Sequence, residues 1–277
     1  MGLYDEVVEV PRRTMVLFFL VDTSGSMKGE KIGTVNTAIE EIVPELKDIS
    51  ETNADAQIKI ATLAFSTGAR WVDDAPVAAE EFRWNYLDAD GVTDLGEACR
   101  KLNDKLSRNE FMSDATGSFA PAIFLISDGE PTDDYKRGLE KLRQNNWFRK
   151  AIRVALAIGK DANEDVLAEF TGNMEAVIHA YTPEALKKWI QFVSVRASEI
   201  GSKSANVNVE PAPVVSEDGT ADVDGEPAAI PSDDAIFDSA AELTEELVSK
   251  QEEFIQEIRN QEEEAEDWES FDDGIEW

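Results

Sequence analysis

The sequence contains only one cysteine, Cys99, and only one histidine, His179. A single cysteine excludes an internal disulfide framework and a cysteine-rich zinc site, and Cys99 is expected to pack as a small helix residue in GEACRKL. A serine hydrolase needs a base near its nucleophile, whereas the one imidazole lies in a predicted strand, AVIHAY. No stretch matches G-x-S-x-G or G-x-x-x-x-G-K-[ST], which excludes a nucleophile elbow and a P-loop.

Basic residues are also scarce: 26 Lys and Arg stand against 58 Asp and Glu, a formal net charge of −32. Residues 1–200 carry a net charge of −11, and residues 201–277 carry −21. Nucleic acid and anionic membranes need basic patches, so this balance argues against both and favours a cationic surface or a divalent metal. No apolar run approaches the roughly 20 residues of a membrane span, and we expect a cytoplasmic protein.

Apolar residues follow the alternating pattern of an α/β protein. Six segments are typical of strands, several of them apolar on both faces: residues 15–21, 56–66, 69–72, 120–127, 151–159 and 175–181. Helical spacing is found at residues 31–49, 95–106, 135–148, 163–172 and 183–198. The pattern predicts a doubly wound, mostly parallel six-stranded sheet with helices on both faces, a Rossmann-like fold whose ligands bind beyond the carboxyl ends of the strands.

Three loops at strand ends or helix starts carry oxygen-bearing side chains. The segment DTSGSM places Asp22, Ser24 and Ser26 after the first strand, GVTD places Thr93 before a helix, and ISDGE places Asp128 after the strand AIFLIS. All three loops can converge at one edge of the sheet. Two carboxylates and three hydroxyls suit a hard cation, Mg²⁺ or Mn²⁺, better than a many-coordinate Ca²⁺ site. Because hydroxyls neutralise the ion poorly, the metal would stay electrophilic and accept a carboxylate from a partner.

Other interpretations of these residues stay open. Taken alone, D-x-S-x-S also fits a helix N-cap followed by a turn. A metal-dependent phosphohydrolase would use Asp22 and Asp128, although the second carboxylate that such phosphatases carry two residues later is here Ser24. A structural domain with a vacant site is a third hypothesis. We predict an interaction module and not an enzyme.

The segments FLVDTSGSM, GVTDLGEA and LISDGEPTDD resemble the von Willebrand factor A (VWA) domain and its metal-ion-dependent adhesion site (MIDAS). The resemblance covers roughly residues 12–198. It implies that the serines and the threonine coordinate Mg²⁺ directly or nearly so, that the aspartates act largely through water, and that an acidic side chain of a ligand completes the shell. The motif positions that match are Asp22, Ser24, Ser26, Thr93 and Asp128. The same segments look like bacterial VWA proteins of tellurium-resistance and stress operons, which implies a scaffold beside kinase- and phosphatase-like partners.

Several side chains near these loops have two interpretations each. Lys28 would steer an acidic ligand toward the metal or simply be solvated. The aromatic residues Trp71, Trp84 and Tyr86 would form a wall beside the site or pack within the domain.

Composition divides the chain into four parts: an N-terminal extension (1–11), the VWA domain (12–198), a flexible acidic linker (199–234) and a terminal part (235–277). The linker is rich in Pro, Gly, Ser and acids and has no sustained period. The terminal part combines an acidic amphipathic helix with the aromatic and acidic segment EDWESFDDGIEW. Either this tail is a solvated extension, or it docks on a basic groove of a partner or of this protein, with a tail carboxylate on the metal as one variant.

Overall fold

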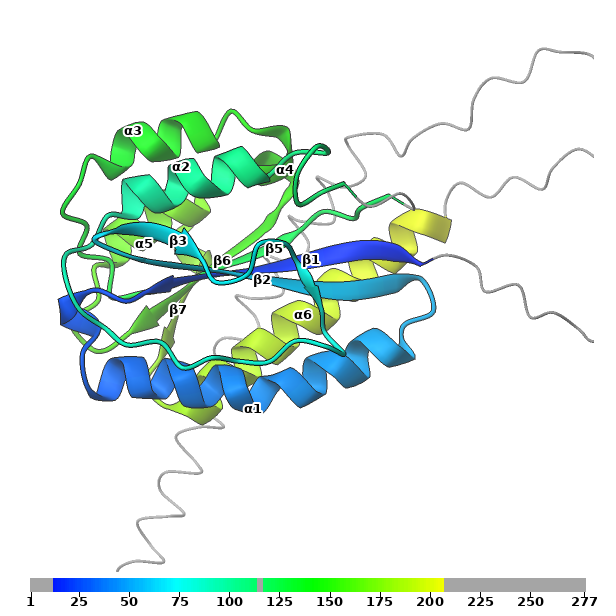
Figure 1. Cartoon of the computed structure of the whole chain (residues 1–277), viewed down its shortest axis with the longest axis horizontal. Helices are drawn as coiled ribbons and strands as arrows, with labels where there is room; N and C mark the ends of the chain where they lie inside the picture. The colour runs from blue at the N-terminus through cyan, green and yellow to red at the C-terminus, as the bar shows by residue number, and fades with distance from the viewer. Residues whose placement is uncertain (1–11, 114–116, 207–277) are drawn as a thin grey trace, which may run out of the picture.

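The computed structural model describes residues 12–113 and 117–206, which form one mixed sheet between two layers of helices (Figure 1). The strands are β1 (Arg13–Asp22), β2 (Ala56–Ser66), β3 (Gly68–Trp71), β4 (Val77–Ala78), β5 (Ala122–Ser127), β6 (Ile152–Ile158) and β7 (Val177–Ala180). The helices are α1 (Glu30–Thr52), α2 (Leu95–Lys105), α3 (Tyr135–Leu142), α4 (Asn146–Lys150), α5 (Glu164–Thr171) and α6 (Pro183–Asn206). Two short 3-10 helices, η1 (Gly25–Met27) and η2 (Met174–Ala176), complete the series.

The sheet has the order β3-β2-β1-β5-β6-β7, and the pairs from β2 to β7 are parallel. Strand β1 lies at its centre and is buried on both faces, which explains its uninterrupted apolar sequence. Alternate residues of β1 belong to two cores: Phe19 packs toward α1 and α6, and Phe18 packs toward α2, α3, α4 and α5. Helices on both faces confirm the doubly wound fold, and β1 and β5 therefore end side by side at one edge of the sheet.

The structure corrects three details of the prediction. Within the described residues, the sheet has seven strands rather than six, because the two-residue strand β4 pairs antiparallel with β2; two residues are too few to show a period. The predicted helix 135–148 is two helices, α3 and α4, because the Asn145 side chain accepts hydrogen bonds from the N–H groups of Trp147 and Phe148 and starts a new helix there.

The third correction concerns the end of the last helix. Helix α6 continues through Asn206, eight residues into the segment predicted as linker. The N-terminal extension, the remaining linker and the predicted acidic helix of residues 235–277 lie outside the described residues. In the described part of the chain, no helix is both long and apolar enough to cross a membrane.

The aromatic residues do not form one wall. Trp71 packs edge-on against Phe111, with ring centroids 4.8 Å apart, on the α2 side of the sheet. Trp84 lies on the α1 side, where its Nε1 donates to Oδ1 of Asn36 at 3.2 Å. The packing interpretation therefore holds for these two residues.

Candidate metal site

The first loop begins where β1 ends, at the fully buried Asp22. Its Oδ1 accepts a hydrogen bond from the backbone N–H of Ser24 at 2.8 Å, which turns the chain back over the end of the strand. The hydroxyl oxygens of Ser24 and Ser26 lie 3.0 Å apart. The alternation seen in the sequence thus places one carboxylate and two hydroxyls in one short loop.

The second oxygen of Asp22 is held from the neighbouring strand. Ser127, the last residue of β5, donates its hydroxyl to Oδ2 of Asp22 at 2.6 Å and accepts from the N–H of Gly129 at 2.8 Å. Burial raises the pKa of Asp22, the hydrogen bonds from Ser127 and Ser24 oppose this rise, and the negative charge of Asp128 adds to it. Asp22, at the end of β1, and Asp128, directly after β5, therefore interact unfavourably with each other.

The loop that carries Thr93 is tied to both other loops by backbone hydrogen bonds. The N–H of Gly25 donates to the carbonyl of Gly91 at 3.0 Å, and a side chain at Gly25 would meet this carbonyl at 3.1 Å. On the other side, the N–H of Thr132 donates to the carbonyl of Thr93 at 2.8 Å. Thr93 is buried, and its loop lies between the Asp22 loop and the Asp128 loop. The convergence that the sequence predicts is therefore present in the backbone.

Asp128 is buried and has two differently placed oxygens. Its Oδ2 lies 3.1 Å from Nζ of Lys31, and the same ammonium lies 2.9 Å from the carboxylate of Asp161. Its Oδ1 is buried and has no hydrogen-bond partner within the described residues. Partial burial works to lower the pKa of Lys31, but its contacts with Asp161 and Asp128 outweigh this and raise the pKa, so the side chain stays an ammonium at neutral pH.

These residues fit a hard divalent cation. The unpaired acceptor of Asp128 leaves a position where a metal-bound water or a metal would satisfy a buried oxygen. Within the described residues, no group of three or more His, Cys, Asp or Glu side chains gathers to hold a metal. A metal here would therefore depend on the hydroxyls of Ser24, Ser26 and Thr93, a set of oxygen donors that suits Mg²⁺ or Mn²⁺.

A family model described as von Willebrand factor type A domain matches residues 17–194. This chain belongs to the VWA family. Members of this family are typically metal-dependent interaction modules. The matched range contains all five predicted site residues and, apart from the first four residues of β1, all the strands of the described sheet.

Solved structures share the fold of this VWA domain. The pilus adhesin SpaC from Lactobacillus rhamnosus GG superposes with a TM-score of 0.53 at 12% identity, over 68% of this chain and 31% of the adhesin. Proximal thread matrix protein 1 from the mussel byssus, solved with a zinc-occupied MIDAS motif, gives 0.50 at 14% identity, over 68% of this chain and 48% of that protein.

A von Willebrand factor type A protein from Catenulispora acidiphila gives a TM-score of 0.49 at 18% identity, over 67% of this chain and 43% of that protein. The chain thus spans less than half the length of each of these three relatives. Among curated proteins, none matches this chain significantly.

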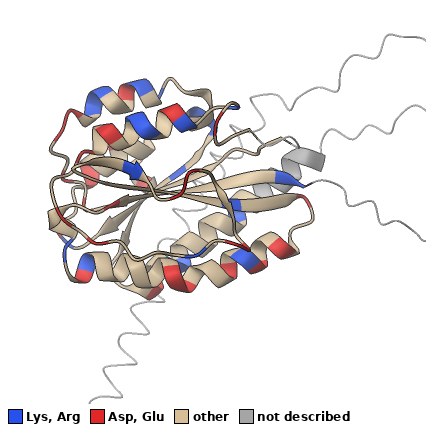
Figure 2. Cartoon of the chain, in the orientation of Figure 1, with Lys and Arg blue, Asp and Glu red and all other residues tan. Residues whose placement is uncertain are grey.

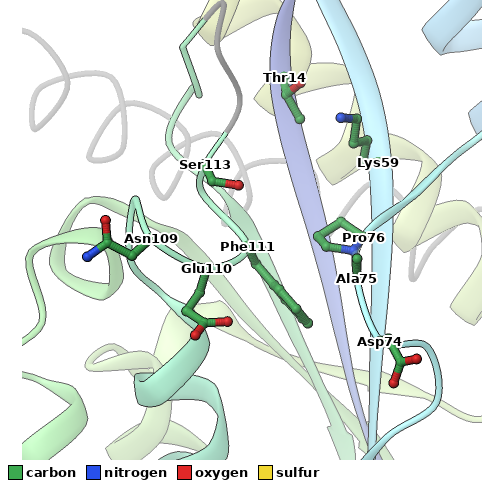
Figure 3. Close-up of a pocket in the computed structure, with 9 residues that line it drawn as sticks. All are labelled: Thr14, Lys59, Asp74, Ala75, Pro76, Asn109, Glu110, Phe111 and Ser113. Carbon is green, nitrogen blue, oxygen red and sulfur yellow. The ribbon is translucent and has the colours of Figure 1, made fainter.

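The VWA domain also contains a cavity of about 300 Å³ (Figure 3). Its lining includes Thr14 of β1, Lys59 of β2 and residues of two loops, 74–76 and 109–113. None of the five predicted site residues contributes to its walls. The chemistry of the loops, and not this cavity, therefore locates the candidate site.

Ser127 and Lys31 both contact a site aspartate, and neither was predicted from the sequence. Ser127 had a local signal, because it directly precedes Asp128 at a strand end that the fold places beside Asp22. Lys31 had none, because 97 residues separate it from Asp128. Lys28, the lysine considered from sequence, instead pairs with the exposed Asp90 at 2.7 Å.

Proposed function

We propose that this VWA domain binds Mg²⁺, or Mn²⁺, through Asp22, Ser24, Ser26, Thr93 and Asp128, and that the metal recruits an acidic side chain of a partner protein. The observation that carries the proposal is the buried Oδ1 of Asp128, which lacks a partner in the described residues where three oxygen-bearing loops meet. The zinc-occupied MIDAS motif of the byssus protein supports a divalent metal at such a site. Three hydroxyl ligands would leave the metal electrophilic, so a carboxylate is the ligand that it attracts most strongly.

Interaction is favoured over phosphohydrolase activity. A nucleophilic aspartate needs one accessible carboxylate oxygen, whereas Asp22 is fully buried and both of its oxygens accept hydrogen bonds, from Ser24 and Ser127. The residue two positions later is Ser24, so the acid or base that such phosphatases carry at this position is missing. We therefore propose no catalytic residue.

Metal titration tests the proposed site directly. Mn²⁺ binding to the full chain is measured by electron paramagnetic resonance of the free ion, with Mg²⁺ as competitor. The Asp22→Asn variant is expected to lose binding, because the amide removes the buried negative charge that faces the ion. The matched control is Asp90→Asn, which removes one charge from the exposed rim, where Asp90 pairs with Lys28, and is expected to bind as wild type does. Equal binding by all three proteins would reject the site.

Partner recruitment is tested by copurification from native lysate in Mg²⁺ and in EDTA, with the same two variants. A partner retained by wild type and Asp90→Asn in Mg²⁺, and lost by Asp22→Asn, supports metal-bridged recognition. Metal-dependent phosphate ester hydrolysis by the purified wild type, absent in Asp22→Asn, would instead favour the phosphohydrolase.

On the resemblance of its motifs, we propose that the protein acts in a cytoplasmic bacterial stress or tellurium-resistance system, with kinase- and phosphatase-like proteins as the expected partners.

A second contact is proposed for the acidic tail. Residues 207–277 hold 24 acids and two bases, whereas residues 135–153 hold seven bases and one acid. Lys and Arg are frequent along α2 and α3, and acids predominate on α1 (Figure 2). A coil of about 27 residues spans roughly 26–31 Å on average, more than the radius of gyration of roughly 16 Å expected for a domain of this size. Charge complementarity therefore supports docking of the tail on the α3–α4 segment, in cis or on a second molecule.

Charge reversal on α3 and α4 tests this docking in the full chain. The triple change Arg137→Glu, Lys141→Glu and Arg149→Glu is expected to increase hydrogen exchange and protease cleavage of the tail at low salt, because these exposed bases lie in the basic segment. Removing three bases elsewhere, with Lys47, Lys187 and Lys188 changed to Glu, gives a control of equal charge. Identical tail protection in both variants and wild type would support the solvated extension.

A further inference from the structure

Lys31 is built into the metal site rather than lying on its rim. It is the second residue of α1, and its side chain is only 19% exposed, compared with 58% for Lys28. Its ammonium bridges Asp128, which directly follows β5, and Asp161, in the loop after β6. The lysine therefore holds a fixed charge directly against one of the two buried site carboxylates.

Gly159 makes room for this lysine. A Cβ at position 159 would lie 2.6 Å from Cε of Lys31, and the backbone there has φ of +90°, which L side chains rarely adopt. The aliphatic stem of Lys31 thus passes against the backbone of the β6–α5 loop, where no side chain stands in its way. The position of the ammonium is set by the fold on both sides, as well as by the attraction of the two aspartates.

The charge balance of the site depends on Lys31. Asp22 and Asp128 are buried, and with the Lys31 ammonium they sum to −1, while the 73% exposed side chain of Asp161 is screened by water. A bound divalent cation changes this sum to +1, and one incoming carboxylate brings it to zero. Without Lys31, the metal alone would neutralise the two aspartates, and a carboxylate would leave a net negative charge in a buried site.

We propose that Lys31 is a specificity-determining residue that keeps the metal-loaded site positively charged. Its charge lowers the affinity of the site for the metal and raises the affinity of the metal-loaded site for an anionic ligand. This inference rests on the proposed metal site and gives the site a ligand preference that the five metal-binding residues do not provide. The metal-loaded site therefore requires an acidic group, and it holds its metal most tightly while that group is bound.

The experiment uses the full chain with Lys31→Met, which keeps the length of the stem and removes the charge. Mn²⁺ affinity is measured by paramagnetic resonance, and acetate affinity is measured by the loss of water-proton relaxation as acetate replaces water on the bound Mn²⁺. We expect Mn²⁺ to bind about tenfold more tightly and acetate about tenfold more weakly, the effect of one charge interaction of about 1.4 kcal/mol on each equilibrium. The two changes have opposite signs, which a general loss of structure would not produce.

Two further variants complete the test. Lys28→Met removes the same charge from the exposed Lys28–Asp90 pair and is expected to change both affinities less than about twofold, because water screens it. Lys31→Arg keeps the charge and is expected to behave as wild type. Weaker Mn²⁺ binding in Lys31→Met would show that Lys31 positions Asp128 instead, and unchanged or tighter acetate binding would equally overturn the inference. Absence of Mn²⁺ binding in wild type would reject the metal site itself. That result differs from the two outcomes for Lys31→Met that would overturn only the role of Lys31.

Discussion

Replacing Ser127 with alanine tests whether its hydroxyl joins the end of β5 to Asp22 at the end of β1. The change removes the 2.6 Å hydrogen bond to Oδ2 of Asp22 and leaves the N–H of Gly129 without its 2.8 Å acceptor. A hydrogen bond to a charged group contributes about 1.5–3 kcal/mol, and a buried unpaired donor costs about 1–3 kcal/mol. Because the two losses share one hydroxyl and the site can relax, we expect about 3 kcal/mol of lost stability, or roughly 6–12 °C in Tm.

Ser194 supplies the matched control for this substitution. It is also fully buried, but its hydroxyl has no hydrogen-bond partner in the described part of the chain. Ser194→Ala is therefore expected to leave the free energy of unfolding unchanged or to raise it slightly, because no bond is lost and a buried polar group is removed. Urea unfolding of both variants in EDTA measures the difference. Equal destabilisation by Ser127→Ala and Ser194→Ala would refute the bridging role of Ser127.

The loss of stability caused by Ser127→Ala should also depend on pH, and the ionisation of Asp22 determines the direction of this dependence. The pKa of Asp22 is raised in the folded protein from its ordinary value of 3.8, mainly by burial. Ionisation of this residue therefore lowers stability as pH rises from about 3.8 through the folded pKa. Loss of the Ser127 donor raises this pKa further, so the stability gap between variant and wild type should widen across that window and narrow again in acid.

Three further outcomes follow from individual contacts. Gly138→Ala would place its Cβ 2.5 Å from the carbonyl oxygen of Gly96 and should cost about 1–3 kcal/mol in urea unfolding, whereas Gly33→Ala, with nothing within 4 Å, should gain about 0.5–1 kcal/mol. Burial, with a smaller effect of the charge of Asp133, raises the pKa of Cys99 to about 12, so Ellman's reagent at pH 8 should label this thiol only after unfolding in guanidinium. Asp22→Asn removes a buried charge but also one of the two oxygens that accept from Ser24 and Ser127, so these effects on stability in EDTA oppose each other, and its Tm should no longer rise with Mg²⁺.

The fold was predictable because its strongest signals are local. A run from Met15 to Val21 with no polar residue is compatible with a strand covered on both faces, and the spacing of apolar residues predicts the helices. Parallel strands bring their carboxyl ends to one edge, so Asp22 and Asp128 had to lie near each other once β1 and β5 were neighbours. The backbone contacts of Gly91 and Thr132 then account for the third loop.

The rest was not predictable because it depends on contacts through space or on weak local preferences. The two-residue strand β4 exists only because β2 offers it a partner. The break between α3 and α4 depends on one Asn145 side chain, which competes with the backbone for the same N–H groups. From sequence, Lys31 is an ordinary residue in the first turn of α1. Only the folded structure places its ammonium against Asp128 and Asp161, in the loops after β5 and β6.

The candidate site contains an unfavourable interaction that a bound cation would relieve. Burial and the nearby charge of Asp128 both disfavour ionised Asp22, and hydrogen bonds from Ser127 and Ser24 only partly offset them. Lys31 compensates Asp128 through Oδ2 but leaves Oδ1 unpaired within the described residues, so the cost is reduced and not removed. A cation bound at the proposed site would therefore stabilise the folded domain. With the Lys31 ammonium beside such a cation, the charges of the site would balance only once an acidic ligand had bound, which would couple ligand binding to the two buried carboxylates.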